Sequence, residues 1–381
     1  MTSRSSDPAA STPPAAPAAP AEGGSAAVAA APDLLGLSRD ELGAVLAPLV
    51  DRPFRARQIY AAIHQRGATD FADMTELAKP LRERLAAAHA IAVPRVVERH
   101  LSTDGTRKYL LGLGDGATIE AVDIPDRGRH TLCLSSQAGC ALACRFCVTG
   151  YWGAGRNLTA GEIVGQVHRI RFDQPPLPPS LNLVFMGMGE PLHNLAAVRR
   201  ALDILEELVS YRRVTISTAG VIPGIEEMAR WPRRPNLAVS LHAPDDERRS
   251  AIMPINRTYP LADLLAALRR YPLERGRRVT FEYVLIRDFN DRLADADALS
   301  RVIAGLRAKV NLIPTNPDPV LGDKMVPPEP AVIQAFQQRL LDRGVTTTVR
   351  RRRGDDVAAA CGQLRAFGRT PRGFRRSNLS W

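Results

Sequence analysis

The sequence predicts an α/β fold in which parallel strands alternate with helices, arranged as a partial (β/α)6 barrel. Helical patterns lie between most of the strand-like segments after Thr131, and one helix begins with a capping box, Thr159 followed by Glu162. Alternation of this kind gives a parallel sheet with helices on one or both faces, so a doubly wound sheet remains an alternative to the partial barrel. The observation on which the prediction mainly rests is a series of apolar, strand-length segments, at residues 131–135, 181–186, 214–217, 237–241, 279–286, 310–313 and 345–349.

The remaining elements follow in chain order. Residues 1–33 are rich in Ala, Pro, Ser and Gly, which predicts a disordered tail. Residues 34–94 carry apolar side chains at helical spacing, with basic residues on the outside, and predict a small helical accessory domain. At 95–130 the period changes to two around Asp115-Gly116, which predicts a short antiparallel element. The α/β domain extends over 131–366, with Asn194 as an expected helix N-cap and further helices at 261–271, 294–307 and 331–343, before a basic tail at 367–381.

The composition narrows the class of partner. The chain has 381 residues, 45% of them hydrophobic, and a net charge of +11, which favours an acidic partner such as nucleic acid. A cationic membrane-surface protein is the alternative, but no basic amphipathic helix stands out, and no run of about 18 apolar residues predicts a membrane span. Five cysteines do not form a disulfide framework and fit a reducing, cytoplasmic location.

Three of the cysteines form a compact motif. Cys140, Cys144 and Cys147 are spaced C-x3-C-x2-C directly after the first apolar segment. Such a loop can place three thiolates on three corners of a [4Fe–4S] cluster and leave the fourth iron open to another ligand. A Cys3His zinc site or three unrelated buried thiols are the alternatives.

Further polar residues follow the predicted strands at the ends where ligands collect in βα folds. Glycines after the second strand let the backbone approach a ligand, and Glu190 offers a carboxylate to an ammonium group, although an ordinary turn would look the same. A buried, hydrogen-bonded histidine is the alternative for His242. Side chains suited to a nucleoside follow the other strands, and the whole set is Gly189, Glu190, Ser217, Ser240, Leu241, His242 and Asn316.

The last cysteine, Cys361, lies among small residues shortly after a run of arginines at 350–353. Inert packing in an Ala-rich helix is the alternative for this thiol. The arginine run predicts either a solvated surface or a phosphate-binding face.

Taken together these motifs resemble the RlmN-type dual-specificity RNA methyltransferases, which are radical S-adenosylmethionine (SAM) enzymes that methylate C2 of adenine. The resemblance extends from about residue 54 to 364. It implies a partial (β/α)6 radical SAM barrel, preceded by a small N-terminal helical domain and a short antiparallel β element. The matching stretches are IEAVDIP, TLCLSSQAGCALACRFC, NLTAGEIVGQV, FMGMGEPLHN, RRVTISTAGVIPGI, LAVSLHAP, VNLIPTNP and RGDDVAAACGQL.

The resemblance also assigns roles. Cys140, Cys144 and Cys147 would hold the cluster, and the strand-end residues would contact SAM. Cys361 would be methylated by a first SAM, and a radical made from a second SAM would activate that methyl group for addition to adenine. Cys133 would then attack the thioether sulfur and release the product, leaving a disulfide. Glu120 matches the family's proton acceptor, but the sequence leaves open whether Glu120 or Cys133 takes the proton, or whether Glu120 forms a structural ion pair.

The implied partners are 23S rRNA near the peptidyl transferase centre, tRNA at the adenine 3′ of the anticodon, and a flavodoxin- or ferredoxin-type electron donor. A monomer is expected. Rival readings are a Cfr-like enzyme that methylates C8 of the same rRNA adenine, and a non-catalytic, zinc-containing RNA-binding protein. A methylthiotransferase is disfavoured because the chain lacks three further cysteines for a second cluster.

The chain departs from the family pattern at residues 148–153 and at Thr315, where an aromatic residue is more usual. We expect these differences to affect substrate fit and not the assigned catalytic groups.

Overall fold

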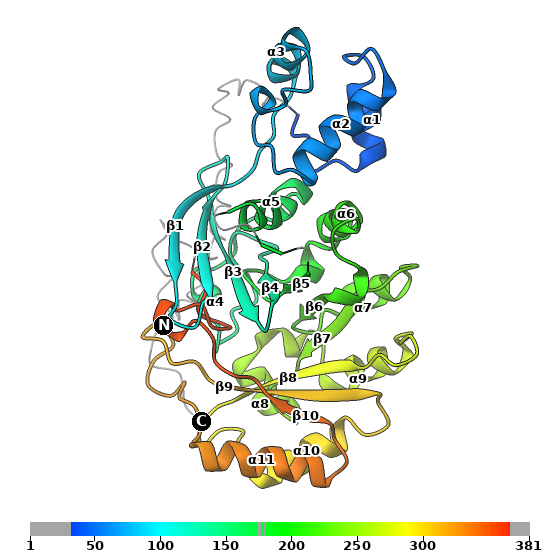
Figure 1. Ribbon diagram of the computed structural model, residues 1–381. Helices are drawn as coiled ribbons and strands as arrows, with labels where there is room; N and C mark the ends of the chain where they lie inside the picture. Colours follow the sequence, from blue (N-terminus) through cyan, green and yellow to red (C-terminus); the bar gives the residue numbers. More distant parts are fainter. Residues whose placement is uncertain (1–31, 174–176, 179, 366–381) are drawn as a thin grey trace, which may run out of the picture. The chain divides into compact units, whose positions relative to one another are not determined.

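The computed structural model describes residues 32–173, 177, 178 and 180–365. The predicted basic tail and nearly all of the predicted disordered tail lie outside these residues. The strands form one ten-stranded sheet whose spatial order follows the chain order (Figure 1). The strands are β1 (Arg95–Leu101), β2 (Arg107–Gly112), β3 (Thr118–Asp126), β4 (Arg129–Cys133), β5 (Leu181–Phe185), β6 (Val214–Thr218), β7 (Asn236–Ser240), β8 (Val279–Leu285), β9 (Ala308–Pro314) and β10 (Thr347–Val349).

The direction of pairing divides the sheet into two parts. β1 to β4 are antiparallel neighbours, whereas β4 to β10 are parallel neighbours. In a right-handed βαβ unit each crossover returns on the same side of the sheet. Because the parallel strands follow one another without a reversal of order, their helices share one face, as in a barrel. This order excludes the doubly wound alternative, and the partial barrel prediction is confirmed.

The parallel strands are apolar because both of their faces are covered. Phe185, Ile216, Val239 and Phe281 are all at most 1% exposed and belong to the central core. Helices cover the outer face of the sheet (Figure 1). They are α5 (Ala160–Arg171), α6 (Leu195–Leu205), α7 (Ile222–Ala229), α8 (Asp246–Ile252), α9 (Leu261–Arg270), α10 (Leu293–Val302) and α11 (Pro330–Asp342). Residues 134–159, between β4 and α5, carry Cys140, Cys144 and Cys147 and form what we call the cysteine loop, which includes the short α4 (Val148–Tyr151).

Most of the predicted helix boundaries and both predicted N-cap positions agree with the structure. The capping box of Thr159 and Glu162 is present at the start of α5. Asn194 does occupy the N-cap position of α6, but its side chain makes no cap hydrogen bond. It donates instead to the carbonyl oxygens of Ser136 and Leu158, both at 2.8 Å, and so ties the cysteine loop to the next βα unit.

The N-terminal helices α1 (Arg39–Leu46), α2 (Pro53–His64) and α3 (Lys79–Ala88) precede the sheet. Ser38 and Glu41 form a capping box on α1, and Pro53 at the first position of α2 has the fixed φ that suits a helix start. Their apolar faces bury Leu42, Ile59 and other residues. Among the helices of the described residues, none has the length and the apolar character needed to cross a membrane.

Candidate functional site: two adjoining cavities at the strand ends

The carboxyl ends of the parallel strands surround a cavity that we call the cysteine-loop cavity. The sequence predicted this location, because in a parallel sheet all carboxyl ends meet at one edge. Leu241 is fully buried behind the wall, and Cys133 and Glu120 lie elsewhere. The cavity brings together most of the predicted site residues: Cys140, Cys144, Cys147, Gly189, Glu190, Ser217, Ser240, His242, Asn316 and Cys361.

The cysteine loop owes its shape to close backbone contacts. Cys140 N–H donates to the Gly153 carbonyl at 2.9 Å, and Cys147 N–H donates to the Cys144 carbonyl at 3.1 Å. A Cβ atom on Gly155 would lie 1.7 Å from the Ala138 oxygen, so only glycine fits at that position. The loop therefore holds its three thiols around the same space.

The three thiols are buried, and burial favours their protonated forms. Burial raises the pKa of Cys140 to about 12 and raises the pKa of both Cys144 and Cys147, and the nearby Cys147 raises the pKa of Cys140 and Cys144 further. Bound metal would hold these sulfurs deprotonated. Within the described part of the chain, no group of three Cys, His, Asp or Glu side chains is arranged to hold a single metal ion. The C-x3-C-x2-C spacing of three thiols around a shared space fits three corners of a [4Fe–4S] cluster.

Glu190 is a buried carboxylate that lacks a cationic partner. It is 3% exposed and accepts hydrogen bonds from Leu192 N–H at 3.0 Å and Ala219 N–H at 2.8 Å. Burial raises the pKa of Glu190 to about 7. Among the described residues no Lys or Arg forms an ion pair with it. An ammonium group entering the cavity would therefore find an uncompensated acceptor beside the cysteine loop.

Gly189 positions this carboxylate. Its φ of +97° is unfavourable for other residues, and a Cβ atom there would lie 2.5 Å from Cβ of Gln137. The Gln137 side chain in turn accepts a hydrogen bond from Glu190 N–H at 2.8 Å. The second strand end is thus fastened directly onto the cysteine loop.

His242 fits both predictions made for it, a residue that contacts a ligand and a buried, hydrogen-bonded histidine. It lines the cavity, but it is also 2% exposed, and its Nδ1 accepts a hydrogen bond from Val284 N–H at 3.0 Å. Burial lowers the pKa of His242 to about 3, so the ring is neutral at physiological pH. Its edge-on contact with Phe146, at 4.4 Å between ring centroids, orients an aromatic side chain of the cysteine loop.

Asn316 carries an unused acceptor. Its Nδ2 donates to the Cys361 carbonyl at 3.1 Å, whereas its buried Oδ1 has no hydrogen-bond partner. Buried polar atoms are normally satisfied. The free Oδ1 therefore fits a ligand that brings a donor, such as the exocyclic amine of an adenine.

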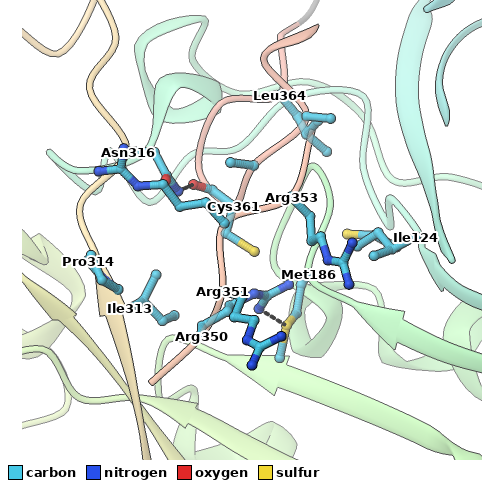
Figure 2. A pocket seen from close by; sticks show the side chains of 14 residues that line it. Ile124, Met186, Ile313, Pro314, Asn316, Arg350, Arg351, Arg353, Cys361 and Leu364 are labelled. Atoms are coloured by element: carbon cyan, nitrogen blue, oxygen red, sulfur yellow. Dashed lines mark hydrogen bonds between the residues drawn. The ribbon is translucent and has the colours of Figure 1, made fainter. Parts of the chain in front are cut away.

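A second cavity, which we call the arginine cavity, adjoins the first. Its lining includes Cys133, Cys361 and the four arginines of residues 350–353 (Figure 2), and no acidic side chain is among the described residues that line it. Met186, Ile313, Asn316, Arg350 and Cys361 line both cavities. Cys361 therefore lies at the boundary between the cavity lined by Cys140, Cys144 and Cys147 and the cavity lined by arginines.

The segment that carries Cys361 is an irregular turn, so the Ala-rich helix considered as an alternative is wrong. Gly354, Ala358 and Gly362 all have positive φ. Val148 N–H donates to the Gly362 carbonyl at 2.6 Å, and the Thr149 hydroxyl donates to the Leu364 carbonyl at 2.8 Å. The cysteine loop thus holds the Cys361 turn directly.

Cys133 and Cys361 share an electrostatic environment. Burial and the neighbouring Cys361 raise the pKa of the Cys133 thiol, while Arg350 opposes this effect. The two sulfurs and Glu282 raise the pKa of Arg350. The Arg350 guanidinium also donates to the Met186 sulfur at 3.7 Å, and the Cys361 side chain points toward it in Figure 2.

Glu120 lines neither cavity. It is fully buried on β3, where Lys108 Nζ lies 3.2 Å from Oε1 and Arg365 N–H donates to Oε2 at 2.7 Å. Burial raises the pKa of Glu120, whereas the positive charge of Lys108 lowers it. These contacts favour the structural ion-pair alternative and connect the sheet to the segment after Cys361.

Two further polar residues of the cavities were missed at the sequence level. Glu282 is 5% exposed, lines the cysteine-loop cavity and accepts a hydrogen bond from Asn311 at 2.7 Å. The sequence could have indicated Glu282, because it lies within an apolar strand segment. Burying a carboxylate is costly, so such a residue often has a functional role. Arg350 was noted only as part of a run of arginines.

Two residues at which the chain departs from the family pattern have structural roles. Thr149 donates to the Leu364 carbonyl and so anchors the segment that carries Cys361. Thr315, at the cavity wall, donates its hydroxyl to the Leu285 carbonyl.

Comparison with known proteins agrees with this geometry. Residues 32–91 match the ribosomal RNA large subunit methyltransferase N-terminal domain, and residues 134–298 match the radical SAM superfamily. The chain is 46% identical over 347 residues to the dual-specificity RNA methyltransferase RlmN of Anaeromyxobacter dehalogenans, covering 88% of this chain and 92% of the relative. It is 48% identical to the RlmN of Rhodospirillum rubrum, covering 88% of this chain and 80% of the relative.

The structure of a radical SAM methyltransferase from Sphaerobacter thermophilus is similar throughout. It superposes with a TM-score of 0.82 at 45% identity and covers 88% of this chain and 99% of that one. Full-length similarity in sequence and in fold, together with the two matching domains, shows that the chain belongs to the RlmN family of radical SAM RNA methyltransferases.

Proposed function

We propose that this enzyme methylates C2 of one adenine in 23S rRNA and of the adenine 3′ of the anticodon in tRNA, with Cys361 as the carrier of the methyl group. The observation that carries the proposal is the position of Cys361 in the walls of both cavities. A methyl carrier must meet the methyl donor on one side and the RNA on the other. A lone packing cysteine would need neither contact.

The cysteine-loop cavity supplies the donor side. Cys140, Cys144 and Cys147 would hold the [4Fe–4S] cluster, and Glu190 would bind the ammonium group of SAM. The unpaired Oδ1 of Asn316 would accept a hydrogen bond from its adenine, and Ser217 and Ser240 offer hydroxyl groups at neighbouring strand ends. When bound, the reduced cluster and SAM supply a radical that removes a hydrogen atom from a methyl group.

The chain's own residues perform the remaining steps. The Cys361 thiol gives up its proton and accepts a methyl group from one SAM, and a second SAM is used in the radical step. The activated carbon, still attached to the Cys361 sulfur, forms a bond to C2 of the adenine, and the adduct then loses the C2 proton and one electron, which would return to the cluster. The Cys133 thiolate attacks the Cys361 sulfur and forms a disulfide while the bond between that sulfur and the carbon breaks. The released carbon takes up a proton to become the methyl group, and an external thiol must reduce the disulfide before the next turnover. Arg350 lowers the pKa of Cys133 against the effect of burial and so favours the thiolate form of this attacking group.

The arginine cavity supplies the RNA side. Arg351, Arg352 and Arg353 can contact phosphates while the target base, flipped from a loop, approaches Cys361. This proposal places the enzyme in the cytoplasm with its RNA substrates, acting as a monomer with a flavodoxin- or ferredoxin-type electron donor.

The test is nucleoside analysis of rRNA and tRNA from cells that carry the wild-type chain or single variants. We expect 2-methyladenosine with the wild type and none with Cys361→Ala, although the purified variant still holds its cluster. Cys133→Ala should accumulate protein covalently bound to RNA, because release from Cys361 is blocked.

Other outcomes would contradict specific parts of the proposal. If the product is 8-methyladenosine, the site of methylation is wrong and the Cfr-like reading is correct. If Cys361→Ala still methylates RNA, the carrier role is wrong. A colourless wild-type protein that contains zinc and no iron would exclude the radical mechanism altogether.

A further inference from the structure

Arg249 is a guanidinium group buried in the core beside the cysteine loop. It lies on α8 and has no exposed surface. Its donors bind the carbonyl oxygens of Ala219 at 2.7 Å, Ser240 at 3.0 Å and Leu241 at 3.2 Å, and Oδ1 of Asn256 at 2.6 Å. All four acceptors are neutral. The hydrogen bonds satisfy the guanidinium donors, but they do not neutralise its charge.

No carboxylate among the described residues lies within ion-pair distance of Arg249. Its neighbour Arg248 shows the usual arrangement, with ion pairs to Asp245 at 2.7 Å and Asp295 at 2.6 Å. Burial of an unpaired charge is costly. Although burial lowers the pKa of Arg249 to about 10, the side chain stays protonated at neutral pH. A retained, unpaired cation in the core implies a negative partner that the protein side chains do not provide.

The position of Arg249 identifies that partner. The end of α8 is bonded to the cysteine loop, because Arg145 N–H donates to the Ile252 carbonyl at 2.9 Å. The next residue, Met253, lines the cysteine-loop cavity together with Cys144. The guanidinium itself donates to the carbonyl oxygens of Ala219 and Ser240, and both of these residues line the same cavity. The cation therefore lies directly behind the wall of the cavity that holds the three cysteines.

Gly220 provides the space for this side chain. It has a φ of +105°, and a Cβ atom at this position would lie 3.3 Å from an Arg249 nitrogen and 3.0 Å from Leu264. The strand end of β6 is thus shaped around the guanidinium as well as around the cavity.

A cluster held by three thiolates is an anion, and reduction adds a further negative charge to it. A fixed cation nearby stabilises the reduced form more than the oxidised form, and the low dielectric of the core strengthens the effect. We propose that Arg249 is the charge partner of the cluster and makes its reduction easier, so that the electron needed for the radical step can be delivered by a physiological donor. This inference rests on the cluster assigned under the proposed function and requires nothing of the RNA substrate.

The test is a redox titration of the cluster-loaded protein without RNA, followed by the absorbance of the oxidised cluster and by electron paramagnetic resonance of the reduced one. Arg249→Gln should lower the equilibrium constant for reduction at least ten-fold, a shift of about 59 mV to more negative potential for one electron. Arg249→Lys retains the charge and should recover most of the wild-type value. Arg248→Gln on the same helix removes a cation already paired with carboxylates, so this matched control should change the constant less than two-fold.

A second variant covers the case in which Arg249→Gln does not fold. Asn256→Asp places a carboxylate against the guanidinium with almost no change in volume, and should also shift the potential to more negative values. Unchanged potentials in the folded, cluster-loaded Arg249→Gln or Asn256→Asp protein would overturn the role of Arg249 while leaving the methyltransferase proposal intact. A wild-type chain that binds no iron would overturn both.

Discussion

Replacing Glu190 with Gln should remove a pH dependence of the stability and should weaken ligand binding. The pKa of this carboxyl is raised from 4.5 to about 7 because the side chain is buried away from water and from any cation. The folded state therefore binds the proton more tightly than the unfolded state does. The free energy of unfolding is unaffected by this group below about pH 4.5, falls as the pH rises toward 7, and stays lowered above it.

The magnitude follows from the size of the shift. A difference of about 2.5 pKa units corresponds to about 3 kcal/mol, of which about 2 to 3 kcal/mol is lost between pH 5 and pH 8. The Gln side chain has no such titration, but its amide nitrogen cannot accept the second of the two backbone N–H bonds, which costs about 1 to 3 kcal/mol at every pH. The pH dependence, rather than the absolute stability, is therefore the informative quantity.

The assay is urea unfolding of the cluster-free protein at several pH values between 5 and 8. The free energy of unfolding of the wild type should fall by about 2 to 3 kcal/mol more than that of Glu190→Gln across this range. Glu227→Gln, on the exposed side of α7, is the control and should follow the wild type. If the free energy of unfolding depends on pH in the same way for the wild type and Glu190→Gln, the conclusion that Glu190 is a buried, unpaired carboxylate is wrong.

The same replacement should weaken ligand binding. In the cluster-loaded protein, Glu190→Gln should weaken SAM binding by roughly ten- to a hundred-fold, because a hydrogen bond to a charged group is worth about 1.5 to 3 kcal/mol. Equilibrium dialysis measures this directly. Unchanged affinity would mean that the ammonium group of SAM is bound elsewhere.

Three further predictions concern the cavity walls and the buried ion pair of Lys108 with Glu120. Arg351→Gln should weaken RNA binding and reduce the slope of log K against log salt by about 0.7 to 0.9, and an unchanged slope would remove Arg351 from the phosphate contacts. Gly189→Ala should lower the free energy of unfolding by at least about 1 to 2 kcal/mol, since φ is +97° there and the Gln137 side chain blocks the added methyl group; equal urea midpoints would contradict this. Lys108→Met should destabilise the chain by about 3 to 5 kcal/mol by leaving Glu120 buried without a cation, and adding Glu120→Gln should restore most of the loss. If the double variant is no more stable than Lys108→Met, the ion pair is not the structural role of Glu120.

The sequence was sufficient to predict the parallel strands and the place of the site. Buried parallel strands are continuously apolar, and each predicted segment became a strand. The residue that follows such a strand reaches the same edge as its counterparts, so Glu190, Ser240 and Asn316 could be grouped without coordinates. These inferences depend on local pattern and on a general rule of sheet geometry.

What the sequence could not reveal depends on tertiary contacts. Four consecutive arginines look alike in the sequence, but only the fold places Arg350 between the two cavities. Arg248 and Arg249 are adjacent, yet one is paired with carboxylates and the other is fully buried. The Ala-rich stretch before Cys361 favours a helix by composition, but docking on the cysteine loop imposes a turn. Helix propensity and charge pattern are local properties of the sequence, whereas these three features depend on contacts between distant parts of the chain.

The attachment of the Cys361 turn also bears on the order in which the molecule is assembled. Its anchors are far away in the chain: Thr149 bonds across 215 residues, Glu120 across 245 and Ser102 across 254. Contacts this distant in sequence pay their loop-closure entropy before they gain any energy, so they form late in folding. We therefore expect this turn to be added late in folding. Amide hydrogen exchange during refolding should show residues 354–365 among the last segments to become protected.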